Sequence, residues 1–450
     1  MTERAGKNGL GDRLAVWRSR GGPTPQILNP MRDLPMGGNA VRGAELCASP
    51  VWHGAHVQTF AWLSDLAALG DEAAGRRAAS ATEEWLSLWG NGTGWTPDVT
   101  GLRLLHWIVN ARFVHPRGVP PAAMAALGHQ ARYLARRWAA APNGLPRLQA
   151  LAGLAIVGRA LDLPHLIPDT QTVEATLAKA PCPAIPDLPE VLSLLLCLRT
   201  ACPDLFLTES ITRIGTTLRA LRHPDGTMSR LAGGDGGDPE RMDAALVLAA
   251  LRGTTQAPMS GFARLARGRT TVIQRLKGAL PFEMSSCRHP VIIATPEAMA
   301  EIQLPSVPLG PDALSDVLAT PYRIAARQDG WQKAGLAQHR SITLSADGSA
   351  LQGTDLIEPR TAKLQRRARR RLPLRLAVQF PLAPDLGVEV DQTGVRLALP
   401  NGEIWVFTAS HPVLIVPHPT RIVLSHSFDD FPARFDWTLA KTEGTSRAIR

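Results

Sequence analysis

The sequence predicts a two-part protein, with an α-helical N-terminal half followed by a β-rich C-terminal half. At 450 residues the chain is longer than one hydrophobic core usually organises, so two or more domains are expected. The hydrophobic period is helical from about residue 55 to residue 252 and becomes an alternation after about residue 259. With 45% apolar and 20% charged residues, the composition is that of a globular protein.

The first half is predicted to be a series of amphipathic helices joined by short loops. Breaker or turn residues separate them at 90–94, 120–121, 142–144 and 223–226. Helices in such a series pack as antiparallel hairpins that close into a bundle, solenoid or toroid. The sequence shows no exact repeat of about 20–50 residues, which argues against a regular solenoid. The predicted helices are 56–69, 71–89, 98–114, 121–140, 146–161, 172–178, 188–201, 208–222 and 239–252.

The second half alternates apolar and polar residues, as strands with one buried face do. Asp347-Gly348 and Asn401-Gly402 fall between such runs, and these dipeptides are strong hairpin signals. A many-stranded antiparallel β-sandwich is therefore predicted. The clearest strands are 262–273, 340–345, 374–380, 394–399, 403–408, 413–416 and 421–425.

Positive charge is carried almost entirely by arginine. The chain has 49 basic and 39 acidic side chains, a formal net charge of +10, and only six lysines. Arginine binds carboxylates, sulfates and phosphates through paired hydrogen bonds, so the excess indicates either an anionic partner or an arginine-rich proteome with a solvated surface. The densest run of positive charge, residues 363–375, is predicted to be either a solvated hairpin loop or a segment that binds a polyanion. It has no aromatic residue to stack on bases, so nucleic acid is not expected.

Several common site classes lack their sequence signals. Five cysteines without a C-x-x-C pair predict neither a zinc site nor a disulfide framework, and no cofactor or metal is expected. His53 and His56 could ligate a metal from one helical turn, but without a third ligand a helix-start role is the expected one. No G-x-S-x-G or H-E-x-x-H motif occurs. No secretory signal follows the N-terminus, and the apolar stretches 148–158 and 191–198 are shorter than a membrane span of about 20 residues.

Six segments, in their order along the chain, carry a resemblance to one known family. They are 60–66 (FAWLSDL), 95–108 (WTPDVTGLRLLHWI), 260–270 (SGFARLARGRT), 281–286 (PFEMSS), 344–356 (LSADGSALQGTDL) and 401–407 (NGEIWVF). Together they resemble the heparinase II/III family, from about residue 55 to residue 440. The resemblance implies an incomplete α/α toroid at 55–252 followed by a β-sandwich domain at 259–440, with residues 1–54 as an extension, 253–258 as the linker and 441–450 as a tail.

The resemblance also implies cleavage of an acidic polysaccharide by β-elimination. This reaction removes the C5 proton of a uronic acid and expels the 4-oxygen, so it needs a base, an acid, and groups that hold the carboxylate. In the family these groups are usually Asn, Tyr and His residues from both domains. Relatives usually work in the cell envelope, which is the expected compartment; the cytoplasm is the alternative because no export signal is visible.

The chain departs from the family pattern at four places. Leu145-Pro146 stands where relatives often have Asn-His, and Gln328-Asp-Gly-Trp331 stands where they usually have His-Asp-Gly-Tyr. Residues 377–384 replace a histidine-rich late strand, and 295–320 holds no counterpart of an A-H-S-T segment. These losses favour the alternative that the copy is catalytically degenerate.

The remaining candidates gather on two predicted helices and in the sandwich. Arg103, His106 and Asn110 form one polar stripe, which is either a sugar-contact face or a solvated helix side. The next helix repeats the pattern with Gln130, Tyr133 and Arg137, and a hydrogen-bonded tyrosine packed between helices is the alternative there. The predicted catalytic residues are Tyr133, His106 and His339, and the predicted substrate-binding residues are Arg103, Asn110, Gln130, Arg137 and Trp331.

Three functions follow from these patterns. The first is a lyase acting on acidic, uronate-containing polysaccharide. The second is a degenerate relative that binds acidic glycan or has a structural role in the cell envelope. The third is a basic protein that uses Arg366 to Arg375 on a membrane or nucleic acid. The oligomeric state and the identity of the sugar stay open.

Overall fold

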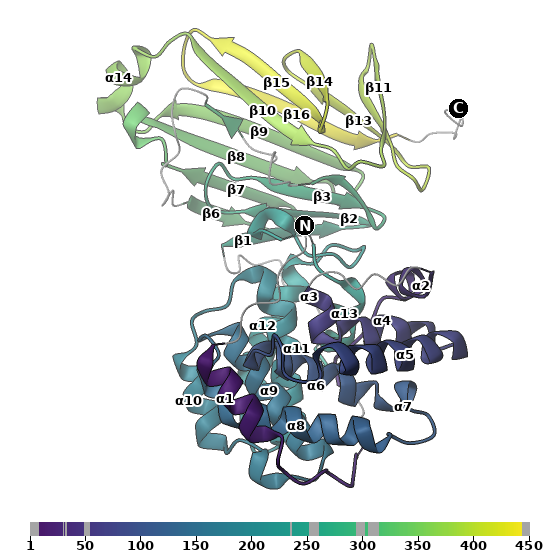
Figure 1. Ribbon diagram of the computed structural model, residues 1–450. Helices are drawn as coiled ribbons and strands as arrows, with labels where there is room; N and C mark the ends of the chain where they lie inside the picture. Colours follow the sequence, from purple (N-terminus) through teal and green to yellow (C-terminus); the bar gives the residue numbers. More distant parts are fainter. Residues whose placement is uncertain are drawn as a thin grey trace. The chain divides into compact units, whose positions relative to one another are not determined.

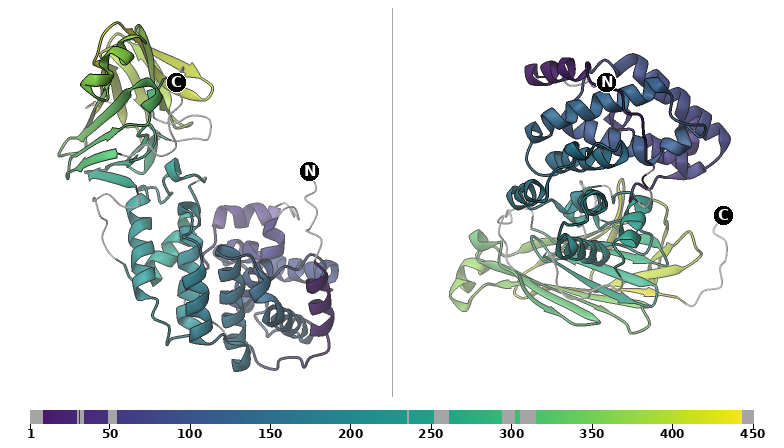
Figure 2. Two further views of the ribbon diagram at one scale, coloured as in Figure 1. Left: turned by 90° about the vertical axis from the view of Figure 1, so that its left-hand side faces the viewer. Right: turned by 90° about the horizontal axis from the view of Figure 1, so that it is seen from below.

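The computed structural model describes residues 9–29, 31, 34–48, 55–234, 236–251, 261–293, 302–304 and 315–442. The chain forms two compact units (Figures 1 and 2). The helical unit comprises residues 1–215 and 238–252, and the sandwich unit comprises 216–237 and 253–450. The chain therefore enters the sandwich unit, returns to add one helix to the helical unit, and enters the sandwich unit again. The predicted linker 253–258, His53 and most of 295–320 lie outside the described residues.

The helical unit contains the predicted series of helices, most of them within a few residues of their expected ends. Asp71, Asp169 and Asp238 each accept a hydrogen bond from a first-turn backbone N–H and so begin α5, α10 and α13. The helices are α1 (Leu10–Ser19), α2 (Ala40–Ala48), α3 (Ala55–Thr59), α4 (Ala61–Leu69), α5 (Glu72–Trp89), α6 (Pro97–Val109), α7 (Ala111–Val114), α8 (Pro121–Arg137), α9 (Leu145–Ala160), α10 (Thr170–Lys179), α11 (Leu188–Ala201), α12 (Thr208–Leu221, whose last residues belong to the sandwich unit) and α13 (Pro239–Leu248).

Helices α6 and α9 cross in backbone contact at two glycines. A Cβ atom on Gly101 would lie 2.4 Å from the carbonyl oxygen of Gln149, and one on Gly153 would lie 2.4 Å from the Cα of Gly101. Neither site has room for a side chain. This crossing fixes the spacing of α6, the helix that carries Arg103, His106 and Asn110.

The sandwich unit is wholly antiparallel in its described strand pairs, as predicted. One sheet has the order β11-β12-β13-β16-β9-β8-β7-β6, and two four-stranded sheets have the orders β14-β15-β10-β5 and β1-β2-β3-β4. The strands are β1 (Phe262–Arg267), β2 (Thr270–Arg275), β3 (Phe282–Ser286), β4 (His289–Ile292), β5 (Ile302–Gln303), β6 (Ser315–Ala319), β7 (Arg323–Gln328), β8 (Leu336–Leu344), β9 (Ala350–Pro359), β10 (Leu374–Pro381), β11 (Gly387–Asp391), β12 (Gly394–Ala398), β13 (Ile404–Ala409), β14 (Val413–Pro417), β15 (Thr420–Phe428) and β16 (Ala433–Lys441).

Both hairpins predicted from their turn dipeptides are confirmed. Gly348 joins β8 to β9 with a φ of 76°, and Gly402 joins β12 to β13 with a φ of 85°, a region of backbone conformation that favours glycine. The predicted strand 262–273 is instead a hairpin, because Gly268 adopts a φ of 51° and turns the chain between β1 and β2.

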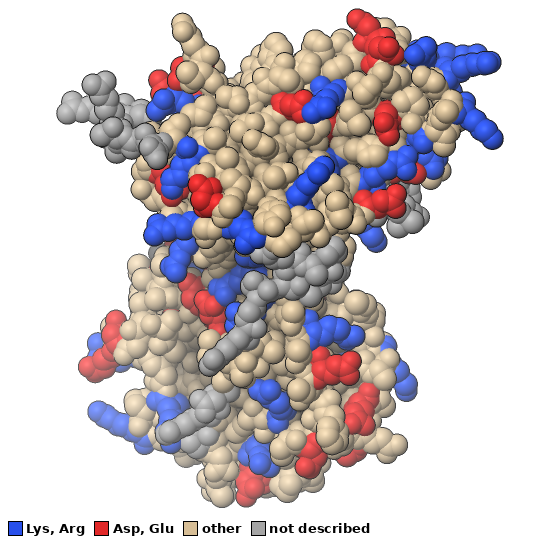
Figure 3. All heavy atoms as spheres, turned by 180° about the vertical axis from the view of Figure 1, so that it is seen from behind, with Lys and Arg blue, Asp and Glu red and all other residues tan. Residues whose placement is uncertain are grey.

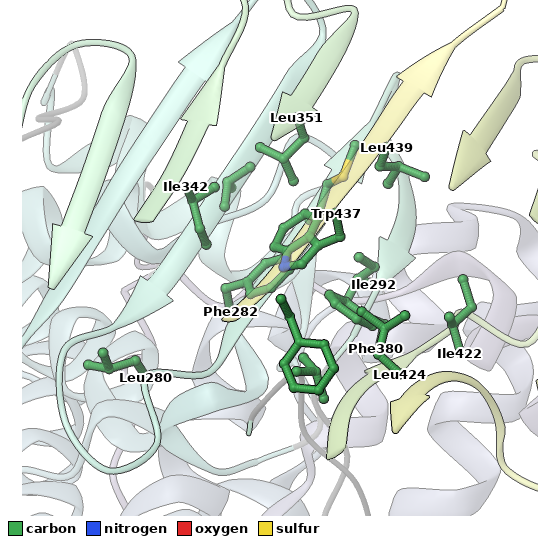
Figure 4. Packing of buried hydrophobic residues seen from close by; sticks show 14 of the residues in the cluster. Leu280, Phe282, Ile292, Ile342, Leu351, Phe380, Ile422, Leu424, Trp437 and Leu439 are labelled. Carbon is green, nitrogen blue, oxygen red and sulfur yellow. The ribbon is translucent and has the colours of Figure 1, made fainter. Parts of the chain in front are cut away.

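Aromatic side chains from facing sheets fill the core of the sandwich (Figure 4). The Trp437 ring stacks on Phe282 with centroids 5.5 Å apart and contacts Phe380 edge to face at 5.1 Å. A Cβ atom on Gly353 would lie 1.9 Å from the Trp437 indole, so the strand beneath this ring needs glycine. Such pairs add to the large apolar area that aromatic rings bury.

The close crossing of α6 and α9 predicts that Gly101→Ala lowers the free energy of unfolding by about 1–3 kcal/mol, because the added methyl group meets backbone atoms that cannot give way. Gly75→Ala in α5 is the matched control, since its Cβ would have no neighbour nearer than 3.6 Å and the better helix propensity of alanine contributes about 1 kcal/mol. Urea unfolding followed by helical circular dichroism measures both. Equal shifts in the two variants would contradict the packing account.

Candidate functional site

The predicted polar stripe on α6 faces the interior of the helical unit. Arg103, His106 and Asn110 are 0%, 3% and 7% exposed. The interpretation of this stripe as a solvated helix side is therefore wrong. Buried polar groups need hydrogen-bond partners, and the structure supplies one for each side chain.

Arg103 and Gln130, two predicted substrate contacts, bind each other. The Arg103 Nε donates to Gln130 Oε1 over 2.6 Å, while its Nη1 donates to the Gln58 carbonyl oxygen over 2.9 Å. The guanidinium carbon lies 4.4 Å from the centroid of the Trp85 ring, a cation–π contact. Burial lowers the pKa of Arg103 to about 9. All of these contacts lie within the helical unit.

His106 and Asn110 share one serine hydroxyl. His106 Nδ1 lies 3.1 Å from Ser64 Oγ, and Asn110 Nδ2 donates to the same oxygen over 3.1 Å. Burial, reinforced by the positive charge of Arg241, lowers the pKa of His106 to about 3. His106 is therefore neutral at physiological pH.

Tyr133 and Arg137 meet at Asp12, a residue of the N-terminal helix α1. The Tyr133 hydroxyl lies 3.1 Å from both Asp12 Oδ1 and the Trp95 carbonyl oxygen, and Arg137 Nε donates to Asp12 over 2.8 Å. Burial first, and then the charge of Asp12, raise the pKa of the Tyr133 phenol. The phenol is therefore protonated and hydrogen-bonded inside this unit.

The other two predicted residues belong to the sandwich unit. His339 lies on β8, 35% exposed, with its Nε2 2.8 Å from Glu358 Oε1 on β9. Trp331 is 2% exposed and packs in the sandwich core. The catalytic and substrate-binding roles given to these eight residues remain predictions.

A buried histidine in the sandwich unit forms a second polar cluster that the sequence did not reveal. His223 Nε2 lies 3.1 Å from Glu283 Oε2, and His223 Nδ1 lies 3.3 Å from Ser285 Oγ. Glu283 and Ser285 are two positions apart on β3, so they share one face of the strand. The backbone N–H of Arg230 donates to both Glu283 oxygens, over 3.0 and 3.2 Å.

The chain builds this cluster with a tight turn after α12. The His223 N–H donates to the Thr227 carbonyl over 2.8 Å, and Asp225 accepts hydrogen bonds from the N–H and hydroxyl of Thr227. Arg264 on β1 braces the turn by donating to the Ala220 and Arg222 carbonyls. Burial lowers the pKa of Arg264 to about 10.

A small cavity of about 20 Å³ lies beside His223 and is also lined by Asp225, Arg230 and Glu283. This is room for one water molecule. The order serine, histidine, carboxylate resembles a hydrolase triad, but Ser285 is only 1% exposed and does not line the cavity. The part of this cluster that could act in catalysis is the His223–Glu283 pair. A histidine oriented by a carboxylate is an arrangement suited to proton transfer.

Comparisons with known proteins identify one domain and the fold. The model of the heparinase II/III-like C-terminal domain matches residues 314–435. Heparan sulfate lyase HepC from Pedobacter heparinus has a similar fold, with 11% identity, a TM-score of 0.51, and coverage of 97% of this chain and 88% of that one. Residues 314–435 therefore match a heparinase II/III-like C-terminal domain, and the chain as a whole has the fold of these heparan sulfate lyases. A heparinase III with methylated lysines is similar too, at 10% identity and a TM-score of 0.55, covering 98% of this chain and 85% of that chain, whereas no curated protein matches.

At one departure from the heparinase pattern the structure shows what the substituted residue does. Gln328, at the position where a histidine was expected, is fully buried on β7. Its Nε2 donates to Gln338 Oε1 over 3.0 Å, and its Oε1 accepts from the Gly330 N–H over 2.5 Å. Gln338 in turn donates to the Ala279 carbonyl over 3.1 Å. Gln328 thus serves as a structural link between β7, β8 and the segment before β3.

The described residues offer three further observations about possible sites. None of their His, Cys, Asp and Glu side chains gather in groups of three or more that could hold a metal ion. No helix among them combines the length and the apolar character needed to cross a membrane. A larger cavity of about 470 Å³ lies in the helical unit beside Arg112 and His115, and none of the eight predicted residues lines it.

The low pKa of His106 predicts a pH dependence of stability. The unfolded chain takes up a proton at this histidine below pH about 6.5, whereas the folded chain does so only near pH 3, so stability falls as the pH falls through this window. His106→Asn removes the titrating group. As the pH falls, the free energy of unfolding of this variant should therefore decrease less steeply than that of the wild type. The two slopes should differ by about 1.4 kcal/mol per pH unit.

Urea unfolding at several pH values between about 6.5 and 4, followed by helical circular dichroism, measures this difference. His165→Asn, at an exposed position of the same unit, is the control and should keep the wild-type slope. Parallel profiles for His106→Asn and the wild type would refute the neutral state of the buried imidazole.

Proposed function

We propose that this chain is a divergent member of the heparinase II/III family and a lyase that cleaves an acidic, uronate-containing polysaccharide by β-elimination. The supporting observation is that its fold matches heparan sulfate lyase HepC along nearly the whole of both chains, with a heparinase II/III-like domain at residues 314–435. At 11% identity this likeness supports the fold. The chemistry therefore has to be argued from this chain's own side chains.

The proposed base is His223. In the elimination the base takes the C5 proton, a double bond forms between C4 and C5, the C4–oxygen bond breaks, and the leaving oxygen receives a proton. Glu283, 3.1 Å from His223 Nε2, would orient the ring and stabilise the imidazolium as it forms. Arg230 lines the same cavity and is the proposed contact for the uronate carboxylate. The cavity of about 20 Å³ has room for one water molecule, so sugar binding requires it to widen around His223.

A second candidate function is acidic-glycan binding without cleavage, with a structural role in the cell envelope as its setting. The observation that favours it is the buried environment of Tyr133 and His106, two of the catalytic residues predicted from the sequence. The Tyr133 hydroxyl and the His106 ring are buried and hydrogen-bonded within the helical unit, and burial keeps both neutral. A neutral, internally paired phenol cannot take the C5 proton in this arrangement.

The lyase proposal predicts new ultraviolet absorbance when the full chain is incubated with a suitable uronate polymer, since elimination leaves a conjugated double bond. Heparan sulfate, hyaluronan, alginate and polygalacturonate form the test panel. His223→Gln and Glu283→Gln should each lower kcat by about 10²–10⁴-fold with a much smaller change in KM, because they remove proton transfer and leave sugar contacts in place. His426→Gln, at an exposed position of β15 in the same unit, is the matched histidine control and should keep the wild-type rate.

The outcomes separate the proposals. Wild-type rates in His223→Gln would remove the assignment of the base, and Tyr133→Phe and His106→Asn in the same assay test the roles predicted from the sequence. Absence of product from every polymer, together with salt-sensitive binding of one of them, would leave glycan binding as the function. Absence of both would overturn both candidates.

A further inference from the structure

Six cationic side chains gather on one short segment of the sandwich unit. Lys363 lies in a 3-10 turn (Ala362–Leu364), and α14 (Gln365–Arg369) and the two residues after it carry the other five. Figure 1 shows α14 projecting at one end of this unit. We call this set the arginine surface; it consists of Lys363, Arg366, Arg367, Arg369, Arg370 and Arg371, all exposed.

The backbone beneath the arginine surface is anchored. The run was predicted to be a hairpin loop, but the chain forms α14 because Ala368 inserts into the sandwich core at 0% exposure. Arg367 Nη2 donates to the Lys333 carbonyl over 2.6 Å, and the Arg371 N–H donates to the Ala368 carbonyl over 3.0 Å. A segment held in this way loses less conformational entropy on binding than a free loop would.

The charge of the arginine surface is largely unneutralised by the described residues. Among them, the one carboxylate within 4.0 Å of these six side chains is Asp430, whose Oδ1 lies 3.7 Å from Arg369 Nη2. Both partners are more than half exposed, at 58% and 71%, so this pair is weak. Figure 3 shows basic side chains projecting from the corresponding corner of the molecule, at the upper right of that view. The surface therefore presents several positive charges to a single ligand.

The residue types indicate which polyanion fits. Five of the six cations are guanidinium groups, which bind sulfate and carboxylate through two parallel hydrogen bonds. Residues 360–375 contain no aromatic ring, so bases cannot stack there. Leu364 and Leu372 are half-buried against the protein, so no apolar face remains to enter a lipid layer.

We infer that the arginine surface is a second binding site for acidic polysaccharide, separate from the His223 cavity. The inference rests on the proposed function for the identity of the polymer. None of the six side chains lines that cavity. A long polymer would be held here by sulfate or carboxylate groups along its length.

The test compares the full-length wild type with the variant Arg366→Gln, Arg369→Gln, Arg370→Gln, Arg371→Gln, which keeps the anchoring Arg367. Binding to heparin is titrated at several salt concentrations, with hyaluronan, phosphatidylserine vesicles and single-stranded DNA as parallel probes. Loss of four contacts should weaken heparin binding on the order of tenfold to hundredfold at low salt and reduce the slope of log affinity against log salt by roughly one per contact. The control variant Arg13→Gln, Arg18→Gln, Arg117→Gln, Arg136→Gln removes the same charge from exposed positions of the helical unit and should bind like the wild type.

Heparin binding that is unchanged in the four-arginine variant, or reduced equally in the control, would overturn the inference. Tighter wild-type binding to vesicles or to DNA than to either polysaccharide would overturn it as well. Ultraviolet absorbance recorded on the same samples keeps the two proposals apart. Binding that depends on the arginines, without any product, would refute the lyase proposal and support the arginine surface as a binding site. Product formation with binding that does not depend on the arginines would support the lyase proposal and refute the arginine surface.

Discussion

The buried ion pair between Arg340 and Asp355 is the interaction on which the sandwich unit depends. Both side chains are fully buried, with Arg340 Nε 2.5 Å from Asp355 Oδ1. Removing two such charges from water costs several kcal/mol each, and the fold tolerates this only if their remaining hydrogen-bonding groups are also satisfied. Trp437 Nε1 donates to Asp355 Oδ2 over 3.0 Å, and Arg340 Nη1 donates to the Leu280 carbonyl over 2.8 Å. Strands β8, β9 and β16 are thereby tied to the segment that leads into β3.

That tie reaches the proposed site through three residues of β3 and its entry. Leu280 accepts from Arg340, and Phe282 stacks on Trp437, so the start of β3 is fixed from two sides. Glu283 follows directly, and its position determines where His223 can find a carboxylate. A residue of the core and a residue of the site therefore stand next to each other on one strand. Substitutions that loosen the core at Phe282 are expected to act on His223 as well, through the register of β3.

Much of the fold could be predicted because periodicity is a local property of the chain. The helix predicted at 188–201 has those ends in the structure, and both dipeptide hairpins are present. The helix predicted at 98–114 breaks at Asn110 into α6 and α7. Asn110 donates from its side chain to the His106 carbonyl and to Ser64, and such local side-chain bonds compete with helix continuation. A pattern of apolar residues contains no information on that competition.

The candidate site was harder to predict because it depends on contacts between distant residues. A polar stripe on an amphipathic helix normally faces water, but Arg103 is compensated by Gln130 and Gln58, which lie 27 and 45 residues away in the sequence. His223 and Glu283 are 60 residues apart, and each belongs to a segment that was interpreted by itself, 223–226 as a turn and 281–286 as part of the family resemblance. One local signal was present: Glu283 and Ser285 are polar residues at alternate positions of β3, a strand whose residues are all buried. Polar residues on a strand buried on both faces indicate a partner elsewhere in the chain.

The positions of the arginines separate two uses that composition alone does not distinguish. A proteome bias and a ligand requirement both raise the arginine count, but they make different demands on where the side chains lie. Arg103, Arg264 and Arg340 are buried and donate to carbonyl oxygens, an amide or a carboxylate of the protein itself, which is a structural use of the guanidinium fork. Residues 366–371 place five arginines on the outside of an anchored segment with one weak carboxylate contact among the described residues. Like charges held this close repel one another and lower the stability of the folded chain, and an anionic polymer bound across them would remove that cost.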